Sequence, residues 1–158
     1  MFYIDYEGEW YHEGEVIRRH ALKKLFSDRA LSIDHEGRYW LSSPEARYPV
    51  QVEDVPFVVI DFDIHVTGTH SQEIILLTNM GDKIILTSEQ KLFLRPEARR
   101  QQIVPYVEVR CGLLARLGRS VWMNLVNRAL EQIQDNSSNI LTIYSGGDVH
   151  PLGEMQDA

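Results

Sequence analysis

The stretch PEARYPVQVEDVPFVVI, residues 44–60, decides the fold, because it holds both a repeated word and the strongest strand pattern of the first half. PEAR returns at 96–99, and the VPF of 55–57 is answered by VPY at 104–106. In both halves a glycine turn, a short apolar segment, PEAR and a Val-Pro-aromatic segment follow in the same order, with offsets of 44, 52 and 49 residues. This order predicts a duplicated unit whose loops differ in length. Two unrelated β-meanders with similar turns are the alternative.

Strand patterns dominate the chain on both sides of this stretch. Alternation and glycine turns predict a small hairpin in 2–16, a strand–turn–strand unit in 31–43, and a hairpin in 73–89 that turns at residues 79–82. Further strands are expected at 55–66, 91–95, 105–117 and 140–147, and the tail from 148 onward is expected to be irregular.

Two segments carry apolar residues at helical spacing. The first helix is expected at 17–28, where the lysines of the last turn suit the negative end of the helix dipole. The second is expected to follow Ser120, a suitable N-cap, and to stop at the polar segment QDNSSN. Its apolar stripe comprises Val121, Leu125, Val126, Ala129, Leu130 and Ile133.

These elements predict an α+β fold. Because strands follow strands through tight turns, the sheets are expected to be mostly antiparallel, with two helices. We expect duplicated, closely packed units, an N-terminal α+β unit over 1–70 and a C-terminal unit over 71–158. Such a duplication makes the cleft between the units a natural ligand site.

Composition indicates the compartment. The single cysteine, Cys111, cannot form an internal disulfide, which favours a reducing environment. The N-terminus MFYIDYEGEW lacks the basic and apolar regions of a signal peptide. No apolar run approaches the roughly 20 residues that span a membrane. We therefore expect a soluble cytoplasmic protein with no membrane association.

The net charge of −7 is unevenly distributed. Residues 1–80 hold 7 basic and 14 acidic side chains, whereas residues 81–158 hold 9 of each. Within the second half, 91–119 carries seven basic and two acidic side chains. The acidic total excludes general DNA coating, which requires a basic footprint. The local basic segment is still suited to a small anion.

The candidate ligand residues come from this basic segment and from turns. Arg110 and Arg116 share a strand face if the strand 105–117 is unbroken, and aligned arginines hold phosphate or carboxylate through bidentate bonds. Pairing of these arginines with the acidic first half is the alternative. The full set of predicted ligand-binding residues is Glu53, Asp54, Asn79, Asp82, Arg95, Arg110 and Arg116.

Each acidic or amide candidate also has a structural reading. Glu53 and Asp54 are neighbours in an extended segment, so they point to opposite faces and do not form an acid–base couple. The structural alternative to ligand binding is that Asp54 caps a turn and Glu53 pairs with an arginine of the basic segment. Asn79 and Asp82 flank a tight turn, and turn chemistry explains both without a ligand.

Catalytic and metal-binding signatures are missing. The chain has no GxSxG, P-loop, HExxH or dinucleotide fingerprint. Asp61, Asp63 and His65 lie on one face of the 55–66 strand, but alternate residues of a flat strand are about 6.5–7 Å apart, too far to chelate a metal without a bulge. We expect no catalytic residue, no metal and no cofactor, and we expect Cys111 to be a small buried residue.

Several segments resemble an uncharacterised proteobacterial family, domain of unknown function 1285. The resemblance rests on VEDVPF, TNMGD and PYVEVR, and it extends over roughly residues 9–147. It implies a duplicated α+β arrangement whose C-terminal half is similar to a pleckstrin-homology-like barrel with a capping helix. It also implies a nucleotide-like or nucleic-acid-like ligand between the halves and a part in signal transduction, with no established activity.

Three functional hypotheses follow. The first is a non-enzymatic sensor or binding module that holds a small anionic, nucleotide-like ligand between the units. The second is an interaction scaffold for a protein partner or for self-association, motivated by the asymmetric charge. The third is a metal-assisted hydrolase that uses Asp61, Asp63 and His65.

Overall fold

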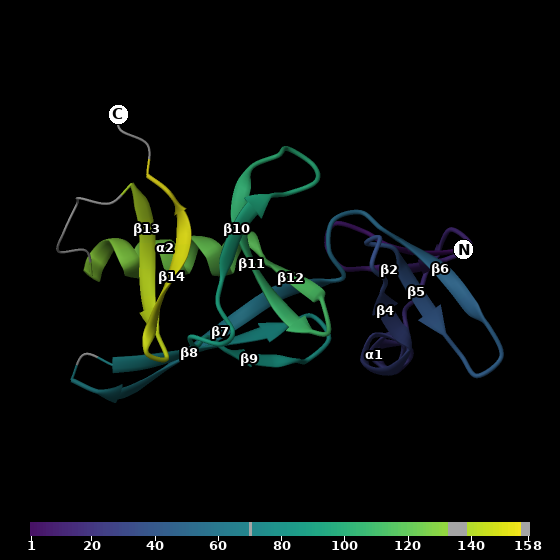
Figure 1. Ribbon diagram of the computed structural model, residues 1–158, viewed down its shortest axis with the longest axis horizontal. Helices are drawn as coiled ribbons and strands as arrows, with labels where there is room; N and C mark the ends of the chain where they lie inside the picture. The colour runs from purple at the N-terminus through teal and green to yellow at the C-terminus, as the bar shows by residue number, and fades with distance from the viewer. Residues whose placement is uncertain (70, 133–138, 156–158) are drawn as a thin grey trace.

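The computed structural model describes residues 1–69, 71–132 and 139–155. The chain forms two six-stranded sheets, which residues 53–56 connect. The two sheets lie end to end in an elongated molecule (Figure 1). The first sheet contains β1 (Phe2–Ile4), β2 (Trp10–His12), β3 (Glu15–Val16), β4 (Leu31–Ile33), β5 (Tyr39–Ser42) and β6 (Arg47–Val52). The second contains β7 (Phe57–Gly68), β8 (Ser71–Thr78), β9 (Lys83–Ile85), β10 (Phe93–Pro96), β11 (Ile103–Arg110) and β12 (Leu113–Leu117).

Both sheets have the same strand order. The first runs β3-β2-β1-β6-β5-β4, and the second, taken from its far edge, runs β9-β8-β7-β12-β11-β10. Each is a pair of three-stranded antiparallel meanders joined by one parallel pair, β1 with β6 and β7 with β12. This common topology supports a duplicated α+β unit with mostly antiparallel sheets, as the sequence predicted. The predicted division between residues 70 and 71 falls between β7 and β8, which belong to the same sheet.

The repeated word does not mark the structural repeat. PEAR at 44–47 leads into β6, whereas PEAR at 96–99 leads into β11, which is the counterpart of β5. The alignment of the halves predicted from the word is therefore wrong by one strand, although the sheets themselves repeat. The first copy runs from the loop between β5 and β6 into β6, and the second runs from the end of β10 into the turn at 98–100, so proline recurs in both for local reasons.

Three hairpins share one turn geometry. Because this geometry depends on residues within the turn itself, the hairpins could be predicted from the sequence. A side-chain oxygen at the end of the first strand accepts the N–H groups two and four residues further on; Asp5, Asp34 and Thr78 each act in this way. The glycine of each turn has positive φ, which a residue without Cβ adopts at no steric cost. These glycines are Gly8, Gly37 and Gly81.

The long strand predicted at 105–117 is wrong. It is a hairpin of β11 and β12, and Cys111 and Gly112 form its turn with φ of 48° and 80°. Two successive residues of positive φ are the geometry of a type I′ turn. Cys111 is exposed at this turn instead of buried. The prediction failed because the apolar residues of the two flanking strands form a pattern that is typical of one continuous strand.

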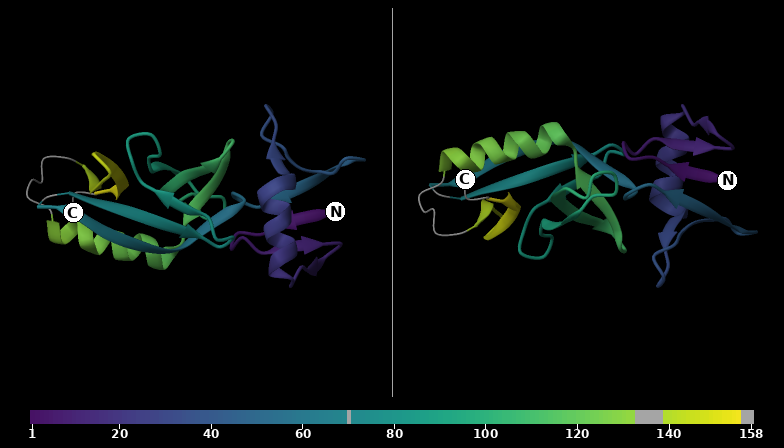
Figure 2. Two further views of the ribbon diagram at one scale, coloured as in Figure 1. Left: turned by 90° about the horizontal axis from the view of Figure 1, so that it is seen from below. Right: turned by 90° about the horizontal axis from the view of Figure 1, so that it is seen from above.

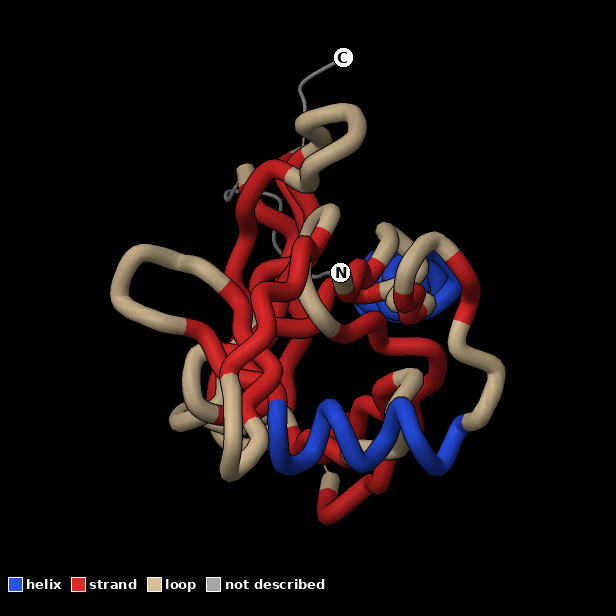
Figure 3. Tube along the Cα trace, turned by 90° about the vertical axis from the view of Figure 1, so that its right-hand side faces the viewer, coloured by secondary structure: helices blue, strands red, loops and turns tan. Residues whose placement is uncertain are grey.

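The helices lie close to their predicted positions. The helix α1 (His20–Leu25) continues into a π-helical turn, η1 (Phe26–Ala30), and this segment lies across one face of the first sheet (Figures 2 and 3). The helix α2 (Arg119–Gln132) begins with Arg119, so Ser120 is a helical residue and not the predicted N-cap. Val121, Leu125 and Ala129 are buried, Leu130 is half exposed, and the predicted stripe residue Ile133 lies outside the described residues.

Residues 148–154 form a strand where an irregular tail was predicted. β13 (Ile140–Ser145) and β14 (Asp148–Glu154) form a two-stranded sheet that packs against the second unit (Figure 1). Buried His150 ties this hairpin down, because its Nδ1 accepts the Leu92 N–H at 3.2 Å and its Nε2 lies 3.1 Å from the Ser145 carbonyl oxygen. One apolar core continues through both units. Among the described residues no helix is long and apolar enough to cross a membrane.

Candidate ligand site between the two units

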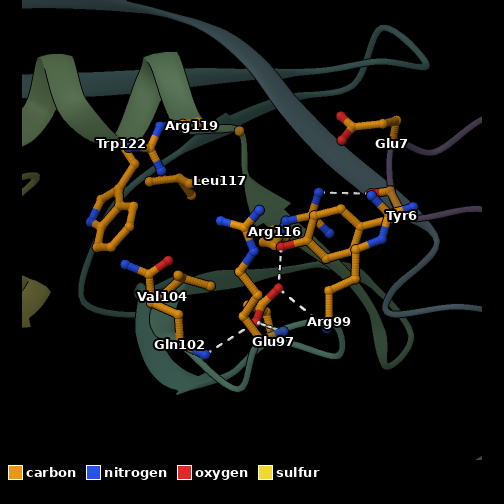
Figure 4. Close-up of a pocket in the computed structure, with 12 residues that line it drawn as sticks. Tyr6, Glu7, Glu97, Arg99, Gln102, Val104, Arg116, Leu117, Arg119 and Trp122 are labelled. Atoms are coloured by element: carbon orange, nitrogen blue, oxygen red, sulfur yellow. Dashed lines mark hydrogen bonds between the residues drawn. The ribbon is translucent and has the colours of Figure 1, made fainter.

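A cavity of about 250 Å³ lies where the two units meet (Figure 4). The turn between β1 and β2 contributes one wall, and the β10–β11 loop, strands β11 and β12 and the first turn of α2 contribute the others. Its lining residues are Tyr6, Glu7, Glu97, Arg99, Arg100, Gln102, Val104, Arg116, Leu117, Gly118, Arg119 and Trp122.

Arg116 ties the units together at the floor of this cavity. Its side chain is 5% exposed and pairs with the 2% exposed carboxylate of Asp54, with Nη1 and Oδ2 3.0 Å apart. Its Nη2 donates to the carbonyl oxygen of Tyr6 at 2.7 Å, and its guanidinium lies 3.6 Å from the centre of the Tyr6 ring. Both charges are desolvated, so removal of either partner leaves a buried charge uncompensated.

The hydroxyl of Tyr106 completes the surroundings of Asp54. It donates to the Asp54 carboxylate at 2.9 Å, within a small cluster of buried residues that includes Val55 and Val104. Burial, reinforced by the hydrogen bond to the carboxylate, raises the pKa of Tyr106 far above its ordinary value. Tyr106 therefore remains a hydrogen-bond donor over the whole physiological range.

Glu97 organises the loop between β10 and β11. Its buried carboxylate accepts N–H groups of Arg99, Arg100 and Gln102 at 3.3, 2.6 and 3.1 Å, together with the hydroxyl of Tyr6 from the other unit. Burial opposes its ionisation, but these four donors outweigh burial and lower the pKa of Glu97 to about 2. Burial and the same carboxylate raise the pKa of Tyr6 to about 12.

Glu53 and Arg99 form a second tie across the junction. The Arg99 Nε and Nη2 donate to the two Glu53 carboxylate oxygens at 2.6 and 3.2 Å, and the guanidinium lies 4.5 Å from the centre of the Tyr6 ring. The hydrogen bond from Arg99 is the main reason that the pKa of Glu53 is lowered. The sequence-based expectation that Glu53 pairs with an arginine of the basic segment is confirmed.

Two arginines of the cavity rim remain without an acidic partner among the described residues, namely Arg100 and Arg119. Arg119 is the first residue of α2, so it lies at the positive end of the helix dipole. The indole of Trp122 donates to the Leu152 carbonyl at 2.6 Å, which fixes its ring as a wall. Figure 4 shows Arg119 and Trp122 on one side of the cavity and Tyr6 and Glu7 on the other.

The structure does not gather the seven predicted ligand residues in one place. Arg116 lines the cavity. Glu53 pairs with Arg99 and Asp54 pairs with Arg116, so these two acids hold arginines of the cavity lining. Arg95 is exposed on the edge strand β10, where its guanidinium lies 4.9 Å from the centre of the Tyr106 ring. The remaining three, Asn79, Asp82 and Arg110, belong to other ties between or within the units.

Arg110 occupies a second cluster at the junction. Its guanidinium pairs with Asp82 at 2.8 Å and Asp28 at 3.4 Å, and it also donates to the Ser27 carbonyl. It does not share a face with Arg116, because the predicted continuous strand turns at residues 111–112. Asn79 accepts the Val58 N–H at 3.1 Å and donates to the Gly8 carbonyl at 3.2 Å, so its amide is also structural.

Sequence reasoning missed most of the cavity lining. Glu97, Arg99, Arg100 and Arg119 all lie in the basic segment 91–119, so the charge count indicated the region without singling out the residues. Tyr6 carried no signal, because its role depends on a turn of the first unit that reaches the second.

The described residues contain no group of three or more His, Cys, Asp or Glu side chains that could hold a metal ion. The strand face of the hydrolase hypothesis is solvated: Asp63 and His65 form an exposed pair at 3.4 Å, and Asp61 accepts the N–H of its own neighbour, Phe62.

The fold and the junction define a two-unit α+β protein with repeated sheet topology and an arginine-lined cavity between the units. Two family models match the chain in the same two parts. "Domain of unknown function (DUF1285), N-terminal domain" matches residues 1–55, and "Protein of unknown function (DUF1285), C-terminal domain" matches residues 56–152. The chain belongs to the DUF1285 family, which confirms the resemblance noted in the sequence.

Two crystal structures of this family are similar to the chain. A DUF1285 family protein from Silicibacter pomeroyi DSS-3 has a TM-score of 0.81 and 25% identity, over 97% of this chain and 79% of that one. A DUF1285 family protein from Shewanella baltica OS155 has a TM-score of 0.59 and 26% identity, over 80% of this chain and 90% of that one. No curated protein matches the chain in sequence.

Proposed function

We propose that the chain is a binding module that holds a small anionic ligand in the cavity between its two units. The observation that carries this proposal is the pair of rim arginines, Arg100 and Arg119, which lack an acidic partner among the described residues. Every other charged group that lines the cavity from the second unit is already engaged. An anion that entered the cavity would therefore meet two available guanidinium groups beside the start of a helix.

The cavity assigns different tasks to its arginines. Arg116 and Arg99 are held by Asp54 and Glu53, so they set the shape of the floor and contribute little charge to a ligand. Arg100 and Arg119 would supply the bidentate hydrogen bonds. The volume of about 250 Å³ lies just below the range of about 300–1,000 Å³ that is usual for ligand pockets. A phosphate ester, a small carboxylate or the phosphate end of a mononucleotide fits this size.

A ligand at this place would touch both units, because Tyr6 and Glu7 come from the first and Arg119 from the second. Binding would then favour one arrangement of the units over others, which is how a non-enzymatic sensor transmits occupancy. The helix α2, which packs against β7 and β13, takes the position of a capping helix in a pleckstrin-homology-like arrangement, and we propose that likeness as part of the same reading.

Thermal denaturation at constant ionic strength tests the proposal. The panel contains inorganic phosphate, sugar phosphates, nucleoside monophosphates, cyclic dinucleotides and small dicarboxylates. A ligand at about 100 times its dissociation constant adds about 2.7 kcal/mol, which corresponds to an increase in Tm of several degrees. We expect one anion class to give this increase.

The variant Arg100→Ala with Arg119→Ala should abolish the increase. Arg128→Ala is the matched control, because Arg128 is exposed on the same helix about two and a half turns beyond Arg119 and does not line the cavity. An equal increase in Tm for the double variant and the control would assign the anion to another place and overturn the proposal, as would the absence of an increase for every anion class.

A further inference from the structure

Among the described residues, no segment covers the outer face of the first sheet, opposite α1 (Figure 2). We define the outer face by Tyr3, Tyr11, Arg38, Trp40, Pro49 and Gln51. Strand register places Tyr3 beside Tyr11 and Gln51, and Trp40 beside Pro49. The alternate residues of the same strands, such as Ile4 and Val50, are buried in the core. A shallow groove crosses the outer face, lined by Tyr3, Trp40, Pro49, Gln51 and Glu53 among others.

The aromatic rings of the outer face are fixed by their polar tips. The hydroxyl of Tyr11 donates to Asp5 at 3.0 Å, and the indole N–H of Trp40 donates to Asp34 at 2.9 Å. The hydroxyl of Tyr3 is held in the same way by the nearby Glu53. Each ring therefore has a fixed orientation, and its side chain remains half exposed. A partner that binds these rings does not have to supply the entropic cost of ordering them.

One guanidinium already sits on the outer face. The guanidinium of Arg47 lies 4.1 Å from the centre of the Trp40 ring, within the range of a cation–π contact. This contact within the chain is an example of a guanidinium that stacks on the Trp40 ring.

Charge makes the outer side of the first unit complementary to a cationic partner. The strand-bearing segments 1–16 and 31–54 hold ten acidic and two basic side chains. The helical segment 17–30, which covers the opposite face, holds five basic side chains and one acidic side chain. Not all of these carboxylates lie on the outer face; those that do include the three that hold its rings. Asp5 and Asp34 have no cationic partner among the described residues, whereas Glu53 already pairs with Arg99.

We propose that the outer face binds an arginine-rich peptide segment of a partner protein. Guanidinium groups stack on Trp40, Tyr3 and Tyr11, and the surrounding carboxylates neutralise their charge. Because a guanidinium is planar and weakly hydrated, arginine is favoured over lysine at such a surface. This site is separate from the anion cavity and has the opposite charge preference.

Three tryptophans allow the test to be read at residue level. Trp40 lies on the outer face, Trp122 lines the junction cavity and Trp10 is buried in the core. Octa-arginine titrated into 15N-labelled full-length chain should shift the indole N–H signal of Trp40 saturably and leave those of Trp10 and Trp122 in place. Octa-lysine should bind at least threefold more weakly, and octa-glutamate should leave all three signals unchanged.

The variant Trp40→Leu removes an aromatic face without changing the charge. It should weaken octa-arginine binding at least fivefold in fluorescence anisotropy, while unchanged Trp10 and Trp122 signals show that the variant is folded. Phe93→Leu, an exposed aromatic of β10 in the second unit, is the matched control and should bind as the wild type does. If Trp40→Leu does not fold, Tyr11→Leu serves the same purpose at the neighbouring strand.

Four results would overturn the proposal. Equal affinity of wild type and Trp40→Leu would show that the peptide is attracted by net charge alone, and so would equal affinity for octa-lysine. A shift of Trp122 without a shift of Trp40 would place the peptide in the cavity. Concentration-dependent self-association in sedimentation that is lost in Trp40→Leu would assign the outer face to the basic helical segment of a second copy.

Discussion

Two arginines, Arg116 and Arg110, tie the second unit to the first, and they do so in different surroundings. Arg116 and its partner Asp54 are 5% and 2% exposed, whereas Arg110 is 30% exposed and its partners Asp82 and Asp28 are 19% and 35% exposed. The contacts are chemically alike, since each guanidinium pairs with a carboxylate and donates to a carbonyl oxygen. The two contacts differ in their access to water. Water can replace a lost partner of Arg110 but not a lost partner of Arg116.

The comparison predicts its largest effect for Arg116→Ala. This change leaves the Asp54 carboxylate buried without its cation, so we expect the free energy of unfolding to fall by about 3–5 kcal/mol. Urea denaturation followed by tryptophan fluorescence measures the loss. The double variant Arg116→Met with Asp54→Leu should recover part of it, because it leaves no buried charge, although the Tyr106 hydroxyl and the Tyr6 carbonyl lose their partners. A loss below about 1 kcal/mol would remove the distinction between the two arginines.

Acid should act on the Arg116 side of the junction through Glu97. Its pKa is about 2 in the folded chain and 4.5 ordinarily, so the unfolded chain binds the proton more tightly. The stabilisation is complete above pH 4.5 and is lost as pH falls toward 2, by on the order of 2–3 kcal/mol. Urea denaturation at a series of pH values measures it. Glu97→Gln should flatten the profile over this range, and an unchanged profile would contradict the assignment.

Arg110→Ala should cost less than Arg116→Ala. The partly exposed pair with Asp82 is worth about 1 kcal/mol, and water can solvate both carboxylates once the guanidinium is gone. The expected loss should also shrink in 0.5 M salt, whereas the loss for Arg116→Ala should not. Equal losses for the two variants, or the same salt dependence, would show that burial does not decide the strength of these ties.

Arg99→Ala should give the smallest effect. The Glu53–Arg99 pair is bidentate, but the Arg99 side chain is 52% exposed, so we expect less than about 1 kcal/mol. Differential scanning calorimetry at low and high salt resolves a change of this size. A loss as large as that of Arg116→Ala would mean that the Tyr6 ring between the two arginines couples them into one network.

Local chemistry explains how much of the fold could be predicted from sequence. Asp34 and Gly37 define a turn within a few residues, so the hairpin around them was correctly placed. The turn at Cys111 carries a weaker signal: Gly112 is its only residue typical of turns, no Asp or Asn precedes it, and the apolar pattern of residues 104–109 and 113–117 on both sides predicts strand. The prediction of one long strand there also put Arg110 and Arg116 on a common face that does not exist.

The site was less predictable than the fold because its contacts are long-range. Asp54 and Arg116 are 62 positions apart in sequence, and Tyr6 and Glu97 are 91 apart. The charge count identified the basic segment. The adjacent positions of Glu53 and Asp54 indicated that their side chains point to opposite faces. Neither observation identified the loop geometry that leaves Arg100 and Arg119 without an acidic partner among the described residues. The repeated word PEAR was misleading for a related reason. It occurs in loops between strands, and the two loops do not occupy equivalent positions in the two sheets.

The parallel pair that joins the meanders of each sheet also governs how the chain reaches this structure. β1 pairs with β6 and β7 pairs with β12, so in each unit the first strand meets its parallel partner only after the last strand has been made. Contacts of such large sequence separation slow folding, because the loop between them must be ordered before the pairing is formed. During synthesis each unit therefore joins its two meanders only after its last strand has been made, and residues 53–56 separate the completion of the first sheet from the start of the second.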